Sequence, residues 1–390
     1  MSTRGVVCII LYLGLVATIA RESLPHYLYV SVPGSDLDRS NGGVSLVVFD
    51  VTRDHKFVKR IPIWPRAETT KRVRGLRIAP SATNTGALGK PLLYISTTRR
   101  LGAVDLASGK VRWENGYRGH CCDEIAVSPD GRILYAPAFG RPEWYVIDSA
   151  SGALVSTVHV IGWPRSTAVS PNGRLAYLAA WESNRLSVAD TATNAITREV
   201  GPFSGYLCPF TTNRKGTLVF ANIDGLVGFE VGDLQTGLVL DRVQVNGYTP
   251  AQLAAYECPS HGLAFTSDER ELWVADGVDN RLRIFDATMY PPVEKSSIQL
   301  TRQPRSITFS RDGRLAYVST GDVLDVASKR VVAALTDERG MLVQSEHMAE
   351  PDMPLTARQP TSKQLETTTL QSPPVHFRYS RKRAYRKSFR

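Results

Sequence analysis

The stretch SPDGRILY at residues 128–135 decides the fold, because it recurs along the chain. It returns as SPNGRLAY at 170–177 and SRDGRLAY at 310–317, and weaker copies are NRKGTLVF at 213–220 and SDERELWV at 267–274. The spacing is 42 residues from Ser128 to Ser170 and 43 residues from Ser267 to Ser310. A regular period of this length is typical of solenoids and propellers.

A second motif keeps a constant distance from the first. It reads VIDSASG at 146–152, VADTATN at 188–194 and IFDATMY at 284–290, with earlier forms AVDLASG at 103–109 and FDVTRD at 49–54. The proline and glycine of SPDG favour a tight turn. The flanking segments alternate in polarity and are rich in β-branched and aromatic residues, which favours strands. Each unit therefore predicts four antiparallel strands, the composition of a propeller blade.

The repeats predict six complete blades and one shared blade. The complete blades are expected at 72–116, 121–160, 163–200, 205–245, 259–300 and 303–336. Three strands precede them, in HYLYVSV, GVSLVVFDV and KFVKRIPI, and one strand is expected after them in GMLVQSEH at 340–347. Joining both chain ends in one sheet removes exposed sheet edges. The predicted fold is all-β, a seven-bladed β-propeller with four-stranded blades, closed by N- and C-terminal strands that share one blade.

The two repeated motifs resemble those of the YVTN-type β-propeller repeat family of exported bacterial proteins, over about residues 27–347. The resemblance implies a seven-bladed propeller similar in fold to lactonase-like propellers. It implies an extracellular or periplasmic binding protein, and it implies neither a single reaction nor a required cofactor.

The two ends of the chain differ from its body. Residues 1–20 read as a secretory signal peptide cleaved near Ala20, with Arg4 ahead of an apolar run. Residues 26–348 are the predicted propeller, and residues 349–390 are a predicted disordered basic tail. Seven of the net +10 charges lie in the last 13 residues, so the body is nearly balanced and nucleic acid is not an expected partner. We expect an exported monomer that meets a membrane only through an uncleaved signal or the tail.

Propellers commonly bind ligands where loops enter the innermost strands. Counting five residues back from Ser128 gives Asp123. The sequence alignment puts Arg74, Arg165, Cys208, Gly262 and Arg305 at the same position, and one residue earlier it puts Val73, Cys122, Pro164, Leu207, His261 and Pro304. The predicted ligand-binding rim is Arg74, Asp123, Arg165, His261 and Arg305.

Three arginines at one rim predict a site for an anionic group, because guanidinium binds carboxylate and phosphate in a bidentate manner. The alternative is that each arginine pairs with an acid or a carbonyl group of a neighbouring blade. The ligand is expected to be an anionic small molecule or a cell-surface component, and no catalytic residue is assigned.

Cysteine and histidine offer a second hypothesis, a zinc or copper site made from His120, Cys122, Cys208 and His261. No CxxC or HxxxH spacing supports it, and adjacent strand residues such as Cys121 and Cys122 point in opposite directions. Buried thiols, a disulfide between Cys208 and Cys258, or a vicinal Cys121–Cys122 disulfide are the alternatives.

Two other functions remain open at this point. One is a metal-dependent lactonase-like or hydrolase-like enzyme, for which Asp123 and Glu124 are the only acids at the aligned rim positions. The other is a surface scaffold for protein or polysaccharide, with the insertion NGYTPAQLAAYEC at 246–258 as its contact.

Overall fold

A computed structural model describes residues 26–33, 43–64, 73–79, 91–120 and 122–351. The chain divides into two compact units, Met1–Leu355 and Thr356–Arg390, and every described residue belongs to the first. The predicted signal peptide and the predicted tail from residue 352 onward lie outside the described residues. Within the described ranges no helix is long and apolar enough to cross a membrane.

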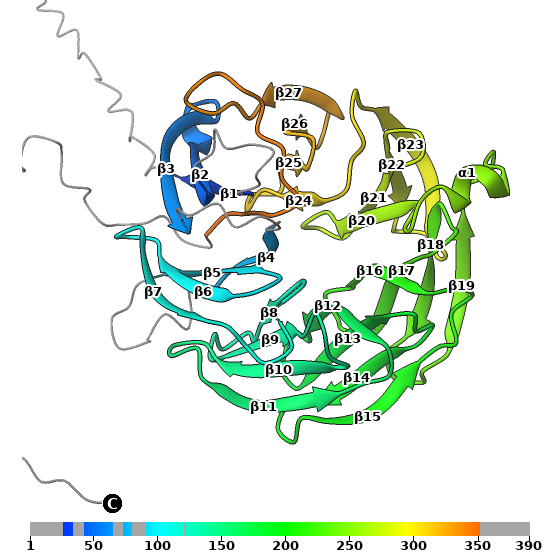
Figure 1. Cartoon of the computed structure of the whole chain (residues 1–390). Helices are drawn as coiled ribbons and strands as arrows, with labels where there is room; N and C mark the ends of the chain where they lie inside the picture. The colour runs from blue at the N-terminus through cyan, green and yellow to red at the C-terminus, as the bar shows by residue number, and fades with distance from the viewer. Residues whose placement is uncertain (1–25, 34–42, 65–72, 80–90, 121, 352–390) are drawn as a thin grey trace, which may run out of the picture. The chain divides into compact units, whose positions relative to one another are not determined.

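The described residues form seven four-stranded antiparallel sheets arranged in a ring (Figure 1). This confirms the predicted propeller, its blade number and its all-β class. The strands, blade by blade, are β28 (Met348–Ala349), β1 (Tyr27–Val32), β2 (Val44–Asp50) and β3 (Lys56–Trp64); β4 (Val73–Ile78), β5 (Leu92–Thr97), β6 (Leu101–Asp105) and β7 (Lys110–Asn115); β8 (Ala126–Val127), β9 (Ile133–Pro137), β10 (Glu143–Asp148) and β11 (Leu154–His159); β12 (Trp163–Val169), β13 (Leu175–Trp181), β14 (Leu186–Asp190) and β15 (Ala195–Val200); β16 (Leu207–Thr212), β17 (Leu218–Ile223), β18 (Gly228–Asp233) and β19 (Val239–Gln244); β20 (Ser260–Phe265), β21 (Glu271–Asp276), β22 (Arg281–Asp286) and β23 (Val293–Gln299); β24 (Ile307–Phe309), β25 (Leu315–Val318), β26 (Asp322–Asp325) and β27 (Arg330–Ala334).

The ring is closed by β28 pairing with β1, as the shared blade requires. The closing strand is not at 340–347, where the sequence predicted it, but at Met348–Ala349. The reason is a turn at its expected start, where the carboxylate of Asp337 accepts hydrogen bonds from the backbone N–H groups of Arg339 and Met341, both at 2.9 Å. After this turn the backbone N–H groups of Val343 and Ser345 donate to the carbonyl oxygens of Leu335 and Ser319 in the preceding blade, so the strand that pairs with β1 begins only at Met348.

The SPDG turn is held by its serine. Ser128 Oγ accepts a hydrogen bond from Ile133 N at 3.0 Å and donates one to Asp130 Oδ1 at 2.5 Å. Gly131 follows with φ of +69°, a conformation that costs other residues about 1–2 kcal/mol. The turns that begin at Ser170 and Ser310 repeat this network.

The weak copy SDERELWV aligns one residue differently from the sequence prediction. Thr266, not Ser267, takes the place of the serine, since its Oγ1 donates to Asp268 Oδ1 at 2.7 Å and accepts from Glu271 N at 3.1 Å. Glu269 then occupies the glycine position with φ of +56°. A threonine that replaces serine, and a glutamate that replaces glycine, conceal this register in the sequence.

One aromatic position recurs in the second strand of every blade. Its side chain is buried between neighbouring blades, where each such burial contributes about 1.5–3 kcal/mol. The position holds Tyr29, Tyr94, Tyr135, Tyr177, Phe220, Trp273 and Tyr317, each at most 4% exposed.

Candidate ligand-binding site at the channel mouth

The strand register identifies one rim position in each blade. The recurrent aromatic pairs directly with a residue of the innermost strand, for example Tyr177 with Ala168 and Tyr29 with Ala349. Counting back three residues from that partner gives the rim residue. Around the ring these are Glu346, Arg74, Asp123, Arg165, Cys208, His261 and Arg305.

This register corrects two sequence assignments. His261 shares the position of Asp123 and the arginines, where the sequence alignment had put Gly262, because that alignment started from Ser267 instead of Thr266. Glu346 was missed altogether. It belongs to the shared blade, where no SPDG turn follows the inner strand, so only the register of β28 against β1 reveals it.

The strand pairing is irregular at several rim residues, which have no partner in the hydrogen-bonded ladder between the first and second strands of their blades. In β4 the pairing passes from Val73 to Gly75 and leaves out Arg74, and in β12 it leaves out Arg165 between Pro164 and Ser166. In β20 the residues left out are His261 and Gly262. A β-bulge of this kind re-aims a side chain. The inner strands therefore present these side chains at the mouth instead of packing them against the sheet.

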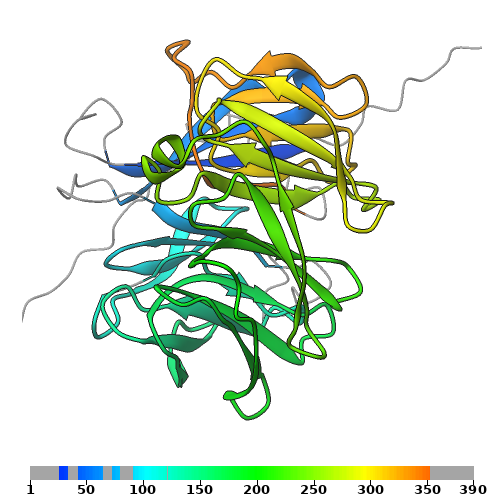
Figure 2. The same cartoon turned by 90° about the vertical axis from the view of Figure 1, so that its right-hand side faces the viewer.

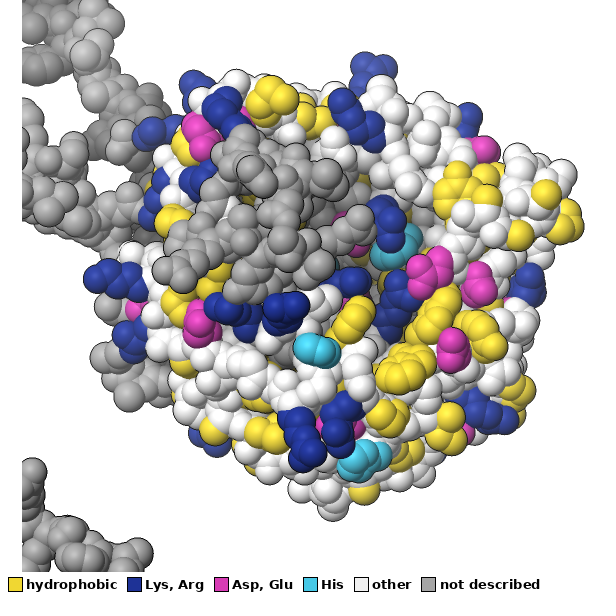
Figure 3. All heavy atoms as spheres, viewed as in Figure 1, with side chains coloured by type: hydrophobic (Ala, Val, Ile, Leu, Met, Phe, Trp, Pro, Cys, Tyr) yellow, Lys and Arg dark blue, Asp and Glu magenta, His cyan; other side chains and the backbone are white. Residues whose placement is uncertain are grey.

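All five predicted rim residues line one cavity of about 270 Å³, together with Glu346. The cavity lies at the mouth of the channel, and the space-filling view shows a hollow there with cationic and histidine side chains beside it (Figure 3). The fold thus brings together the residues that the repeat alignment placed at the rim, which are Arg74, Asp123, Arg165, His261 and Arg305.

Two of the three rim arginines are already paired. Arg165 Nη1 lies 2.6 Å from Glu257 Oε1, and its guanidinium lies 4.8 Å from the centre of the Trp181 ring. Arg305 Nε lies 2.8 Å from Glu346 Oε1. For Arg305 the sequence alternative holds, because Glu346 belongs to the neighbouring shared blade. The partner of Arg165 comes instead from the insertion at 246–258.

Arg74 is different. No described acid forms an ion pair with it, and its buried Nε, like that of Arg305, has no hydrogen-bond partner among the described residues. Its guanidinium lies 5.2 Å from the centre of the Phe139 ring. Arg74 is therefore the arginine of the cavity lining that has no acidic partner among the described residues.

Asp123 lies in the blade between those of Arg74 and Arg165. Burial raises the pKa of Asp123 to about 7, the charges of Arg74 and Arg165 lower it in part, and Glu124 raises it further. Near neutral pH this side chain is therefore partly protonated. It then adds a hydrogen-bond donor to the cavity rather than a full negative charge.

His261 is held as a neutral hydrogen-bonding group. Its Nδ1 lies 2.9 Å from the carbonyl oxygen of Arg305, which can only accept, so Nδ1 carries the proton. Its Nε2 then accepts a hydrogen bond from Arg305 Nη2 at 3.3 Å. Burial lowers the pKa of His261, and the Arg305 charge lowers it further.

The structure does not assemble the predicted metal candidates. Cys208 forms a disulfide with Cys258, so it has no thiolate to offer, and this disulfide is one of the alternatives that the sequence left open. Cys122 is buried in a hydrophobic cluster, and His120 does not line the cavity. Across the described ranges no three His, Cys, Asp or Glu side chains are grouped as metal ligands. Cys121, the other half of the suggested vicinal pair, lies outside the described residues.

The insertion at 246–258 is anchored beside the mouth at both of its ends. It contains the short helix α1 (Pro250–Ala254), capped by reciprocal hydrogen bonds of Thr249 and Gln252, and Figure 2 shows α1 toward the face that Figure 1 presents. Its C-terminal end is held by the Cys208–Cys258 disulfide and by the ion pair between Glu257 and Arg165.

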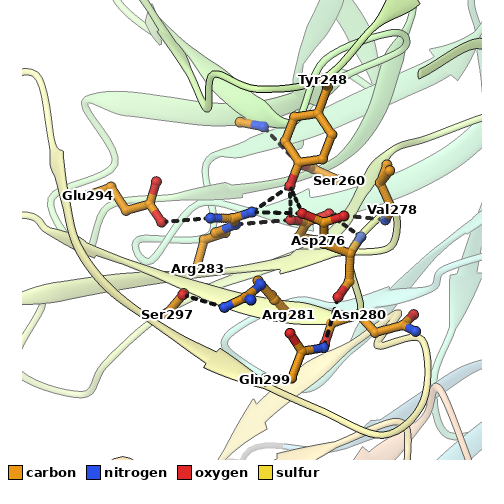
Figure 4. Close-up of polar contacts among 12 residues, drawn as sticks. Tyr248, Ser260, Asp276, Val278, Asn280, Arg281, Arg283, Glu294, Ser297 and Gln299 are labelled. Atoms are coloured by element: carbon orange, nitrogen blue, oxygen red, sulfur yellow. Dashed lines mark hydrogen bonds and ion pairs between the residues drawn. The ribbon is translucent and has the colours of Figure 1, made fainter. Parts of the chain in front are cut away.

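The other end of the insertion is held by Tyr248. Its hydroxyl donates to Asp276 Oδ2 at 2.5 Å and lies 3.0 Å from Asp279 Oδ2 (Figure 4). Arg283 bonds the same hydroxyl and places its Nε 2.9 Å from Asp276 Oδ2. Asp276 is fully buried, so this charge is stabilised only by such contacts. These contacts hold Tyr248 against β21 and β22. The insertion is therefore fixed at both ends beside the mouth of the channel.

Comparison with protein-family models finds none that matches this chain, and comparison with curated proteins finds no match either. The fold itself defines the class: the chain is a seven-bladed β-propeller, with a polar cavity at one mouth of its channel.

Proposed function

We propose that the protein is a binding protein that takes up an organic anion at the channel mouth, with Arg74 as the residue that receives the anionic group. The observation that carries this proposal is the difference among the three rim arginines. Arg165 and Arg305 each have an acid within 2.8 Å, whereas no described acid forms an ion pair with Arg74. A carboxylate or phosphate of the ligand is the anionic partner that the Arg74 guanidinium lacks among the described residues.

The surroundings of Arg74 support an anion over a cation. Glu257 and Glu346 offset the charges of Arg165 and Arg305, which leaves Arg74 as the arginine of the lining without an ion pair among the described residues. A raised pKa lets the neighbouring Asp123 give up its negative charge. The volume of about 270 Å³ is just below the range of ligand pockets, which span about 300–1,000 Å³. The cavity therefore suits one small acidic group of the ligand.

Membership of the YVTN-type repeat family and export through the signal at 1–20 are part of the same proposal. The SPDG and Asp-containing turns of the blades support the family, and a binding protein outside the cytoplasm is the role that this resemblance implies. The proposal assigns no reaction to the site.

Calorimetric titration with citrate, phosphate and galacturonate tests the proposal. At least one of these anions is expected to bind, and Arg74→Gln is expected to weaken it about 10- to 150-fold, since a hydrogen bond to a charged group contributes about 1.5–3 kcal/mol. Arg174→Gln is the matched control, because Arg174 is an exposed arginine at an SPNG turn outside the cavity. The proposal fails if none of the anions binds, or if Arg74→Gln binds as tightly as the control.

A further inference from the structure

We propose that the ligand is an acidic sugar at the end of a glycan, and that the glycan runs from the cavity across an aromatic shelf formed by Trp163, Trp181 and Tyr206. This inference rests on the proposed function for the position of the acidic group. The shelf itself is a separate surface that lies outside the cavity lining.

The residues of the shelf come from two neighbouring blades. Trp163 and Trp181 are direct cross-strand partners on β12 and β13. The ring of Trp181 lies 6.1 Å from that of Tyr206, which precedes the next inner strand, β16. Trp163 is 48% exposed and Tyr206 is 44% exposed. Large aromatic side chains left open in this way mark a binding surface more often than isolated exposed residues do.

The aromatic shelf is next to the cavity in sequence and in space. Trp163 lies two residues before Arg165, and Tyr206 lies two residues before Cys208, so both hold the same position relative to the rim. Gln303 and Gln344 hold that position in two other blades and line the cavity. The guanidinium of Arg165 lines the cavity and lies over Trp181. Figure 3 shows hydrophobic side chains next to cationic ones beside the central hollow.

The cavity lining favours a ligand rich in hydroxyl groups. Hydroxyl and amide side chains, which both donate and accept hydrogen bonds, outnumber apolar ones there. The uncharged polar residues of the lining are Ser31, Ser166, Gln303, Ser319, Gln344 and Ser345. Sugar hydroxyls likewise both donate and accept hydrogen bonds. A single carboxylate on the sugar supplies the ion-pair partner of Arg74.

The shelf favours a sugar ring for a related reason. The face of an aromatic ring carries partial negative charge, and one face of a pyranose presents C–H groups with partial positive charge. A peptide with a terminal carboxylate is the competing ligand. An apolar terminal side chain would need an apolar pocket, but the apolar residues of the lining are only Pro33, Val73 and Pro209 among the described residues.

The experiment compares galacturonic acid with its dimer, trimer and tetramer by calorimetry on the full chain. The monomer is expected to bind through Arg74, and the trimer at least 10-fold more tightly because its further rings reach the shelf. Trp163→Ala and Tyr206→Ala are expected to remove that gain and leave the monomer affinity unchanged, and Trp163→Phe is expected to retain most of it. Tyr290→Ala is the matched control, since Tyr290 is an equally exposed aromatic residue on the β22–β23 turn.

The possible failures are distinguishable. If the trimer binds no better than the monomer, or if Trp163→Ala keeps the gain, the shelf is wrong while the proposed function stands. If citrate or phosphate binds through Arg74 and no uronic acid does, the sugar assignment is wrong. If a peptide with a free terminal carboxylate binds with the Trp163 dependence instead, the ligand class is wrong. If no anion binds, both proposals fail. Equal thermal midpoints of the variants show that each one folds.

Discussion

Replacing Asp123 with asparagine is expected to stabilise the propeller more at pH 8 than at pH 5. Burial, opposed in part by Arg74 and Arg165, raises the pKa of Asp123 from 3.8 to about 7. Between these two values the folded state holds the proton and the unfolded state releases it. The folded state therefore loses stability as pH rises from about 4 to 7, and an asparagine, which cannot ionise, avoids that loss.

The size of the effect follows from the two pKa values of Asp123. At about 1.36 kcal/mol per pKa unit, the full penalty is about 4 kcal/mol at pH 8 and about 1.5 kcal/mol at pH 5. The difference between the two conditions is thus at most about 2.5 kcal/mol. Since the side chain is half-buried and faces a cavity, water screens part of it, and we expect about 1–2.5 kcal/mol.

Urea unfolding of the wild type and Asp123→Asn at pH 5, 6.5 and 8 measures this difference. Asp130→Asn is the control from the same blade. Burial raises the pKa of Asp130, but the hydrogen bonds from Ser128 and Arg132 outweigh this and leave it lowered, so its effect is constant over the window. If Asp123→Asn changes the free energy of unfolding equally at pH 5 and pH 8, Asp123 ionises as an exposed aspartate does and the reasoning is refuted.

Two further predictions concern the border of the mouth. The double variant Cys208→Ser with Cys258→Ser is expected to lower the free energy of unfolding by about 4 kcal/mol, the loop-closure value for residues 50 apart; a thermal midpoint unchanged from that of the wild type would contradict it. Glu257→Gln frees the Arg165 guanidinium, so anion affinity in calorimetry is expected to rise about 2- to 5-fold, as for an exposed ion pair of up to about 1 kcal/mol. Weaker anion binding by this variant would show that Glu257 belongs to the ligand contacts.

Much of the fold could be predicted because blade structure is local. Within a blade the turns depend on residues two to five apart, as Ser128 with Asp130 and Ile133 shows, and such short patterns are visible in a sequence. The prediction failed at a turn that keeps the same hydrogen bonds and backbone conformation with different residue types. Thr266 acts as the serine and Glu269 adopts the glycine conformation, so the blade at 259–300 was aligned one residue out of register.

The sequence predicted which residues line the candidate site. It did not predict which of their charges are paired. The repeat period places Arg74, Asp123, Arg165 and Arg305 at equivalent positions, and equivalent positions of a closed ring face one channel. His261 was included through a neighbouring position in a shifted alignment. Glu346 could not be predicted from the sequence, because it precedes a two-residue strand that no repeated turn follows.

The sequence by itself determined the number of blades, their strand order and the rim that Arg74, Asp123, Arg165 and Arg305 share, since alternation and turn chemistry act over a few residues. Only the tertiary structure decided which arginine stays unpaired. Glu257 reaches Arg165 across 92 residues of chain, and Glu346 reaches Arg305 from the segment just before the closing strand. Such partners meet because ring closure brings insertions and chain ends together, and no local pattern in the sequence encodes which charges then cancel.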